Sequence, residues 1–489
     1  MTDWTETYYG NNARLLYGIN VLSGLQMLPE KSVQCIVTSP PYWGLRNYNT
    51  TPQIWPSIQN PFSIHGEGAG DGVCNHQWQI TDPRRRRSST DVVNMDSKQA
   101  TSVGTLHDLI PANLCTLCGA WQGELGQEPT PDLFIEHLVL IFRECKRVLR
   151  KDGILWVNIG DTYTANPPSP FMGKGLGDGV CKPKELVGIP WLLAFAMRKD
   201  GWWIRQENIW AKPNCMPESV TDRTTRSHES VFMFTQQKDY FYDHQAVKTE
   251  RATDENRPDG CERQAGYDSK YNRIAAKISG KRSEKQRGHP RRHDGFNDRW
   301  DTMSKEEQQQ NGANLRSVWW ITPAQYRESH YATYPVTLPE ICILASTSEG
   351  GCCPKCGTCY EREIEVIGRQ VTEAMRVAGC DSDGGYSGEA QKDYESAKAQ
   401  NASDTKRRIL ESMSNITRSR FVPNCACNAG PPTSCTILDP FMGSGTTAEA
   451  ALTNNRHVIG IDLDPKNLDM AIRRIKKAVA RDERTINLI

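Results

Sequence analysis

The chain has 489 residues, of which 37% are hydrophobic and 24% are charged, and its formal net charge is +1. This length exceeds that of a typical domain, so several folding units are expected, and the near-zero charge excludes a general polycation. No apolar run reaches the roughly 18 residues that span a bilayer, and the N-terminal residues do not resemble a signal peptide, so no membrane association and a cytoplasmic location are expected.

The first segment, residues 1–50, contains a strand, a helix and a second strand. Apolar residues predict strands over 13–19 and 33–37 and a short helix over 23–28. After the second strand come the catalytic candidates Ser39, Pro40, Pro41 and Tyr42. A hydroxyl, a carbonyl fixed by a proline ring and an aromatic face suit a site that grips a planar amino group. The alternative is a rigid turn without chemistry.

The next segment, residues 51–129, has no clear hydrophobic period and is interpreted as an insertion. It contains an arginine run at 84–87 and a Cys-x-x-Cys-Gly knuckle preceded by a Cys-x-His pair. The predicted zinc ligands are Cys74, His76, Cys115 and Cys118. The chain has 17 cysteines, and in an intracellular protein these do not indicate a disulfide framework. The alternative to a zinc site is therefore a set of reduced thiols.

Regular structure returns over residues 130–244. Helical spacing of apolar residues predicts helices over 132–149 and 189–197, each ended by a Lys-Asp-Gly turn. Strands are expected over 154–159, 202–210 and 230–234. Helices alternating with strands predict an α/β sheet with partly parallel strands.

Residues 245–318 are polar and basic. A protein of neutral charge with such a local cluster fits a bounded nucleic-acid footprint, and the alternative is a solvated loop. The candidate phosphate-binding residues are Lys281, Arg282, Lys285, Arg287, Arg291 and Arg292.

A short core segment, residues 319–349, leads to a second insertion, residues 350–432. A further Cys-x-x-Cys-Gly knuckle and a later Cys-x-Cys pair predict a second zinc site. Its expected ligands are Cys353, Cys356, Cys425 and Cys427, with Cys352 or Cys359 as substitutes. Each site can fill four positions, so both are interpreted as structural, not catalytic.

The last segment, residues 433–489, begins with a strand over 436–438, a glycine turn and a helix over 446–454. Glycines allow the backbone to approach a ligand closely, and a helix N-terminus offers free N–H groups, here with two threonines as expected caps. A second strand, 457–461, ends at Asp462, where an acid can accept ribose hydroxyls. The cofactor-binding candidates here are Asp439, Phe441, Gly443, Ser444, Gly445, Thr446, Thr447 and Asp462. The alternative is an ordinary strand–turn–helix unit.

Two strings carry a family resemblance: Thr38-Ser-Pro-Pro-Tyr-Trp43 and, far later, Asp439-Pro-Phe-Met-Gly-Ser-Gly-Thr-Thr447. In this order they resemble the β class of amino-group DNA methyltransferases, which are circularly permuted so that the catalytic motif precedes the cofactor motif. Blocks at 144–149, 210–214, 226–229 and 330–335 extend the resemblance, which omits the insertions and 245–318.

The resemblance implies a Rossmann-like, mostly parallel seven-stranded sheet that binds S-adenosyl-L-methionine (AdoMet), with Tyr334 and Pro335 closing over its methionine end. Asp439 would hold that end, directly or through water. Residues 245–318 would be the target-recognition region, and the implied partner is double-stranded DNA in a bacterial or phage-infected cell.

The implied reaction is methyl transfer to the exocyclic amine of a flipped base that stacks on Tyr42. Ser39 at this position resembles the cytosine-N4 group and so favours cytosine, with adenine N6 as the alternative. Two competing hypotheses are an RNA or protein-glutamine methyltransferase and a zinc-containing nucleic-acid binding protein with an inactive core. A homodimer and a cognate restriction enzyme stay open.

Overall fold

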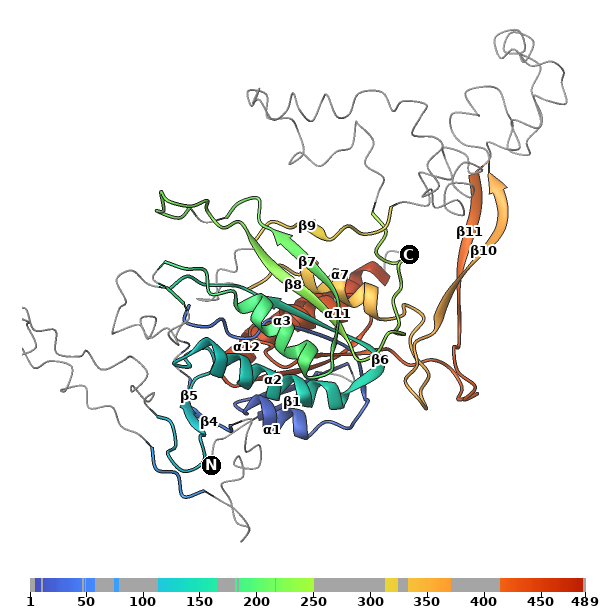
Figure 1. Ribbon diagram of the computed structural model, residues 1–489. Helices are drawn as coiled ribbons and strands as arrows, with labels where there is room; N and C mark the ends of the chain where they lie inside the picture. Colours follow the sequence, from blue (N-terminus) through green and yellow to red (C-terminus); the bar gives the residue numbers. More distant parts are fainter. Residues whose placement is uncertain are drawn as a thin grey trace, which may run out of the picture. The chain divides into compact units, whose positions relative to one another are not determined.

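The structure of the chain is a computed structural model (Figure 1). It describes residues 5–9, 12–45, 48, 50–57, 74–78, 113–164, 181–182, 184–215, 217–249, 313–323, 333–370 and 414–486. Side chains of residues 9, 365–370, 414–417 and 481–486 are left out of the description. The chain divides into two compact units, one made of residues 1–243, 316–360 and 423–489 and the other of 244–315 and 361–422.

The first unit is built on a mixed, mostly parallel sheet of nine described strands. In spatial order they are β1 (Thr5–Tyr9), β2 (Ala13–Tyr17), β13 (His457–Asp462), β12 (Thr436–Asp439), β3 (Val33–Thr38), β6 (Leu149–Ile159), β8 (His228–Thr235), β7 (Trp203–Ala211) and β9 (Val318–Trp320). β8 runs antiparallel to both of its neighbours, and β1 is antiparallel to β2. The seven expected strands are, in spatial order, β2-β13-β12-β3-β6-β8-β7, and β1 and β9 flank them.

The order of the strands shows the circular permutation. β12 and β13 come from the end of the chain, yet they lie between β2 and β3, which come from its beginning. Parallel pairing joins β13 to β2 and β12 to β3. The N-terminal and C-terminal segments therefore complete one sheet.

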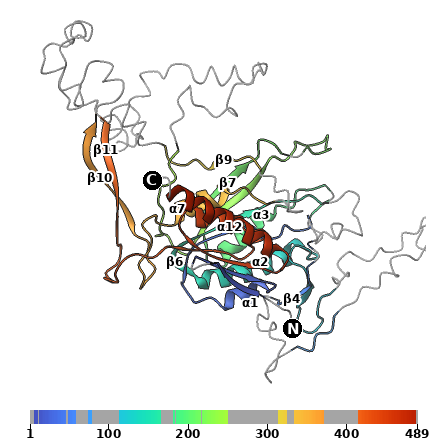
Figure 2. The same ribbon diagram turned by 180° about the vertical axis from the view of Figure 1, so that it is seen from behind.

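Helices cover both faces of this sheet. Figures 1 and 2 show α1 (Val21–Gln26), α2 (Pro131–Val148) and α3 (Ile189–Lys199) on one face. On the other face lie α7 (Thr337–Ser346), α11 (Thr446–Thr453) and α12 (Asn467–Ile486). All six residues of β3 are buried, as expected for a central parallel strand covered on both sides. No described helix has the length and apolarity needed to cross a bilayer.

Helix α2 illustrates how local sequence sets an element. Thr130 caps it by accepting a hydrogen bond from the Leu133 N–H, and Pro131 occupies its first turn. The predicted Lys-Asp-Gly turn after α2 is wrong, because residues 151–153 belong to β6. A Cβ on Gly153 would lie 2.7 Å from the Gln34 carbonyl oxygen, so glycine serves close strand packing at this position.

Four further strands were not predicted from the sequence. β4 (Gln53–Trp55) pairs antiparallel with β5 (Trp121–Gly123) in the first unit. β10 (Glu361–Gln370) and β11 (Ser414–Val422) form an antiparallel ribbon in the second unit, with an irregularity between Val366 and Gly368. The ribbon places Glu363 opposite Arg420, and such cross-strand pairs of opposite charge stabilise strands. Its largely polar sequence offers little hydrophobic pattern from which these strands could be predicted.

Candidate active site

The catalytic loop and the cofactor loop meet at one edge of the sheet. β3 and β12 are adjacent parallel strands, and their carboxyl ends carry Thr38 and Asp439. Thr38 Oγ1 donates a hydrogen bond of 2.8 Å to Asp439 Oδ1 across 401 sequence positions. Ser39 follows Thr38 directly, so the two motifs that the sequence separates are neighbours at the strand ends where α/β proteins bind ligands.

Asp439 is fully buried and accepts four hydrogen bonds from neighbouring groups. Oδ1 accepts from Thr38 and from the Phe441 N–H at 3.0 Å. Oδ2 accepts from Thr447 Oγ1 at 2.6 Å and from Tyr334 OH at 3.0 Å. Burial raises the pKa of Asp439, and these hydrogen bonds oppose the rise. The carboxylate thus ties the catalytic strand, the cofactor loop and residue 334 together.

Tyr334 lies beside the cofactor loop. Its hydroxyl also forms a short hydrogen bond with Thr447 Oγ1, and burial raises its pKa well above the usual value. The next residue, Pro335, is buried, and its carbonyl accepts the Leu338 N–H at 3.0 Å near the start of α7. This segment is therefore anchored to Asp439 and to α7.

The cofactor loop turns back through two left-handed glycines. Gly443 and Gly445 have φ of 52° and 85°, a region in which a side chain is strained. The Gly443 N–H donates to Asp462 Oδ2 at 2.7 Å, and its carbonyl accepts from Tyr17 OH at 2.9 Å. Ser444 Oγ is buried without a hydrogen-bond partner among the described groups. An unpaired buried hydroxyl beside two glycines fits a loop that receives a polar ligand.

Asp462 lies at the end of β13 beside this loop. Its Oδ1 accepts hydrogen bonds from the Asp464 N–H at 2.8 Å and from Asn467 Nδ2 at 3.2 Å. Burial raises the pKa of Asp462 to about 6, although these bonds and the one from Gly443 favour the ionised form. A carboxylate with remaining lone pairs is suited to accept hydroxyl groups.

The expected threonine caps of α11 are wrong. Its N-cap is Gly445, which makes no side-chain cap. Thr447 donates to Asp439, and Thr446 Oγ1 instead accepts a hydrogen bond from Arg474 Nη1 of α12 at 2.9 Å. A Cβ on Gly445 would lie 2.8 Å from Cα of Ala471, so close packing of α11 and α12 also requires glycine at this position.

Ser39 and Tyr42 lie in one hydrogen-bonded network with two residues that the sequence did not single out as site residues. Ser39 Oγ donates to Tyr42 OH at 3.4 Å, and Tyr42 OH donates to Glu229 Oε2 at 2.7 Å. Asn158 Nδ2 lies 2.8 Å from Tyr42 OH, 3.0 Å from Glu229 Oε2 and 3.5 Å from Ser39 Oγ. Lys212 forms a short ion pair with the other Glu229 oxygen.

The ring of Tyr42 packs on the backbone. A Cβ on Gly160 would lie 2.6 Å from the ring, and burial raises the pKa of the Tyr42 phenol well above its usual value. Pro40 is buried, and Pro41 lies against Gly126, whose carbonyl accepts the Gly44 N–H at 2.8 Å. The catalytic loop is therefore held by contacts with the segments that contain Gly126 and Gly160.

Trp43, the neighbour of Tyr42, is only 6% exposed and lies within the main hydrophobic core, so its side chain is buried in the protein. Its Nε1 donates to the Glu128 carbonyl at 2.9 Å. Trp43 therefore anchors the catalytic loop to the segment that precedes α2.

The missed residues left different signals in the sequence. Asn158 is a polar residue, 3% exposed, in the buried strand β6, and an amide in such a run indicates a partner or a role. Glu229 and Lys212 fell inside blocks that resembled the family, without an assigned role. Their meeting depends on the antiparallel pairing of β7 with β8, which local patterns do not encode.

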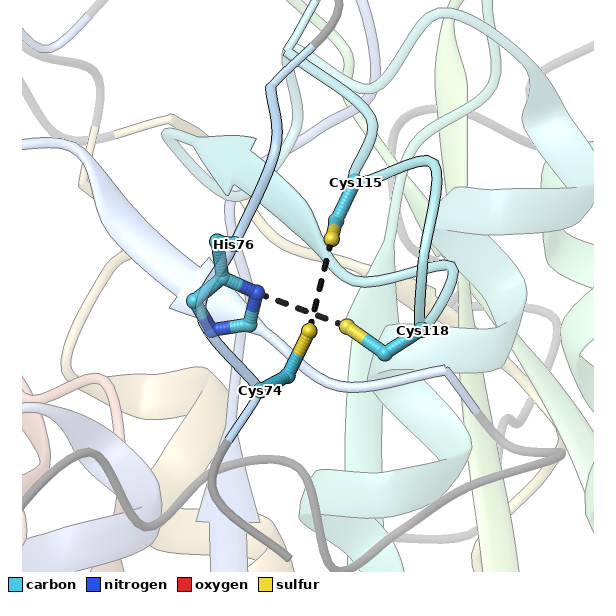
Figure 3. A group of neighbouring side chains, drawn as sticks. All are labelled: Cys74, His76, Cys115 and Cys118. Atoms are coloured by element: carbon cyan, nitrogen blue, oxygen red, sulfur yellow. Dashed lines mark hydrogen bonds between the residues drawn. The ribbon is translucent and has the colours of Figure 1, made fainter.

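The first predicted zinc ligand set comes together in the structure. Figure 3 shows the side chains of Cys74, His76, Cys115 and Cys118 pointing toward one another, and their ligand atoms all lie within 4.8 Å. Cys74 and Cys115 sulfurs are 3.7 Å apart, and Cys118 Sγ lies 3.4 Å from His76 Nδ1. A zinc tetrahedron would have edges of about 3.8 Å between sulfurs and about 3.6 Å between sulfur and nitrogen. The donor set and its spacing fit zinc.

The second set also comes together, with Cys353, Cys356, Cys425 and Cys427 within the same limit. The proposed substitutes lie elsewhere. Cys352 and Cys359 pack with Cys435, whose sulfur is 3.7 Å from Cys359 Sγ. The six predicted phosphate-binding residues between 281 and 292 lie outside the described residues.

The chain is similar to known DNA methyltransferases. The sequence matches the N6/N4 DNA methylase family over residues 33–353 and 397–473. It is 28% identical to the type II methyltransferase M.Cfr9I of Citrobacter freundii over 477 residues, which cover 95% of this chain and 88% of that protein. It is 31% identical to the type II methyltransferase M.XycI of Xanthomonas campestris pv. cyanopsidis over 346 residues, which cover 68% and 73%.

Among solved structures, the PvuII DNA methyltransferase (cytosine-N4-specific) aligns over 100% of this chain and 97% of its own, with 12% identity and a TM-score of 0.41. The family match covers well over half of the chain. The chain belongs to the N6/N4 DNA methylase family and is a DNA methyltransferase.

Proposed function

We propose that the enzyme transfers a methyl group from AdoMet to the exocyclic amine of a flipped base in double-stranded DNA, with cytosine N4 as the favoured target. The observation that carries the proposal is the hydrogen bond between Thr38 and Asp439, which joins the strand of the catalytic loop to the cofactor loop. A direct transfer needs the amine and the methyl donor side by side, and the two loops share one edge of the sheet.

Ser39, Pro40, Pro41 and Tyr42 would form the base site. An exocyclic amine is a poor nucleophile because its lone pair is delocalised into the ring. The Ser39 hydroxyl and the Pro40 carbonyl would accept its N–H hydrogens and leave the lone pair free for attack. Pro41 keeps the loop extended, and the Tyr42 ring would stack on the flipped base.

AdoMet supplies an electrophilic methyl group when it is bound. Asp462 would accept its ribose hydroxyls, and the turn of Gly443, Ser444 and Gly445 would lie against it, with Ser444 Oγ free to form a hydrogen bond. Phe441, Thr446 and Thr447 shape this turn, and Tyr334 and Pro335 would close the methionine end. Because Asp439 is occupied by four protein donors, it would act on that end through the residues it holds.

The choice of cytosine rests on Ser39, since the family more often has Asp or Asn at this position for adenine N6. Adenine N6 is the alternative. The relatives named type II methyltransferases support a role in modification beside a cognate restriction enzyme in a bacterial or phage-infected cell. Target recognition is assigned to residues 245–318, and a homodimer stays open.

Substitution of the base site tests the proposal. Ser39→Ala and Tyr42→Ala should lose most turnover, by about 100-fold or more, because each removes a group that contacts the amine or the base. Both should keep AdoMet affinity, since the side-chain hydrogen bonds of Ser39 and Tyr42 join them to each other, to Asn158 and to Glu229. The checks are the initial rate of tritium transfer to DNA and the AdoMet Kd by calorimetry. Equal loss of both would contradict the assigned roles.

A further inference from the structure

A hydrogen-bonded line leads from the proposed base site to a carboxylate near the surface. Ser39 Oγ donates to Tyr42 OH, and Tyr42 OH donates to Glu229 Oε2. Both hydroxyls therefore point their protons the same way, and the Ser39 oxygen keeps a lone pair for an incoming N–H. The side chain of Glu229 is 16% exposed, so a proton that reaches it can pass to solvent.

The reaction of the proposed function requires such an outlet. As the N–C bond forms, the S–C bond breaks and its electron pair stays on sulfur. The amine nitrogen becomes cationic with two hydrogens and must lose one of them to give the neutral methylamine. A proton acceptor linked to this nitrogen offsets the developing charge in the transition state.

We propose that Glu229 is the terminal proton acceptor of methyl transfer and that Tyr42 and Ser39 relay the proton. The amine proton moves to Ser39 Oγ, the Ser39 proton moves to Tyr42, and the Tyr42 proton moves to Glu229 Oε2. Each hydroxyl ends neutral, the amine loses its charge, and the carboxylate becomes a carboxylic acid that later releases the proton to water. This inference rests on the proposed function.

The surroundings of Glu229 suit this task. Lys212, directly after β7, pairs with the Oε1 oxygen and leaves Oε2 to the relay. Asn158 from β6 is neutral and donates to the Tyr42 and Glu229 oxygens, which fixes their spacing. Lys212 and Tyr42 are the titratable groups seen in contact with Glu229 among the described residues. Asn158 is a positioning residue, because it holds the relay without accepting the proton.

The test compares three variants in single-turnover methyl transfer with saturating AdoMet and DNA. Glu229→Gln keeps the shape but removes the acceptor, and its rate should fall by about 100-fold, within the range for general base catalysis. Tyr42→Phe keeps the ring and interrupts the line, and its rate should fall similarly. Glu207→Gln is the matched control, because Glu207 on the neighbouring strand bonds Ser230 outside the line; its rate should not change.

Rescue by a conservative variant separates a relay from a structural role. Glu229→Asp keeps a carboxylate, so it should recover part of the rate that Glu229→Gln loses. AdoMet affinity and thermal melting should stay near wild type and establish that the variants are folded.

A wild-type rate in Glu229→Gln, or equal rates in Glu229→Asp and Glu229→Gln, would overturn the relay while leaving the proposed function intact. If Glu229→Gln does not fold, a wild-type rate in Tyr42→Phe would overturn it instead. Failure of the wild-type enzyme to methylate DNA would overturn the proposed function itself.

Discussion

Among single residues, Asp439 joins segments that lie far apart in the sequence, because its buried carboxylate accepts hydrogen bonds from four protein donors. That it holds the methionine end of AdoMet, directly or through water, stays a prediction. Two of these donors, Thr38 and Tyr334, lie far from it in the sequence, so no local pattern could reveal them. The positions of the motifs were predictable, but the bonds between them depend on the sheet.

Asp462 should make AdoMet affinity depend on pH. Its pKa is raised to about 6 by burial, so the carboxylate loses its charge as the pH falls below about 6. Since the ionised form accepts ribose hydroxyls best, AdoMet affinity should weaken across this window. The fall should be severalfold between pH 7.5 and pH 5, measured by calorimetry.

The matched variant is Asp462→Asn, which should bind AdoMet more weakly and show a flatter pH dependence. Without AdoMet, the contribution of Asp462 to the free energy of unfolding should change with pH in the opposite sense. A raised folded-state pKa means that the folded protein binds the proton more tightly than the unfolded chain, so this group favours folding as the pH falls through about 6. A pH-independent wild-type affinity would contradict the role of Asp462.

At the scale of elements, prediction from sequence worked where hydrophobic periodicity was strong. Helix α2 and strands β3, β12 and β13 lie within a few residues of their expected bounds, because their burial fixes their pattern. The ribbon of β10 and β11 was missed because its residues are largely polar and its pairing spans a long stretch of chain. Short strands such as β4 carry too few residues for any period.

The two cysteine clusters predict the zinc content of the protein. We expect two zinc ions per chain, each stapling an insertion that has few apolar residues of its own. Cys118→Ser and Cys356→Ser should each lower the zinc content of purified protein from two to one, measured by mass spectrometry of the metal. Each should also lower the melting temperature, because the loops lose their cross-link.

The control for this experiment is Cys359→Ser, which lies in the neighbouring thiol cluster but outside the ligand set. Its zinc content should stay at two. Wild-type protein purified without chelator and free of zinc would contradict the assignment, as would one zinc lost from Cys359→Ser.

At the scale of the whole molecule, the permuted order of the motifs and the order of the strands agree. The end of the chain supplies β12 and β13 to the middle of a sheet that its beginning starts. This arrangement was predictable from two short strings because each string requires the other to complete one site. Which bases the enzyme reads was not predictable, since the segment assigned to that task has neither a hydrophobic period nor a recognisable motif.

The most direct measurement is nucleoside mass spectrometry of unmethylated double-stranded DNA after incubation with purified protein and AdoMet. We expect N4-methylcytosine, with far less of it formed by Ser39→Ala. N6-methyladenine would keep the fold and the amine chemistry but contradict the choice of base made from Ser39. The absence of any methylated base, in a protein that binds both AdoMet and DNA, would contradict the central claim.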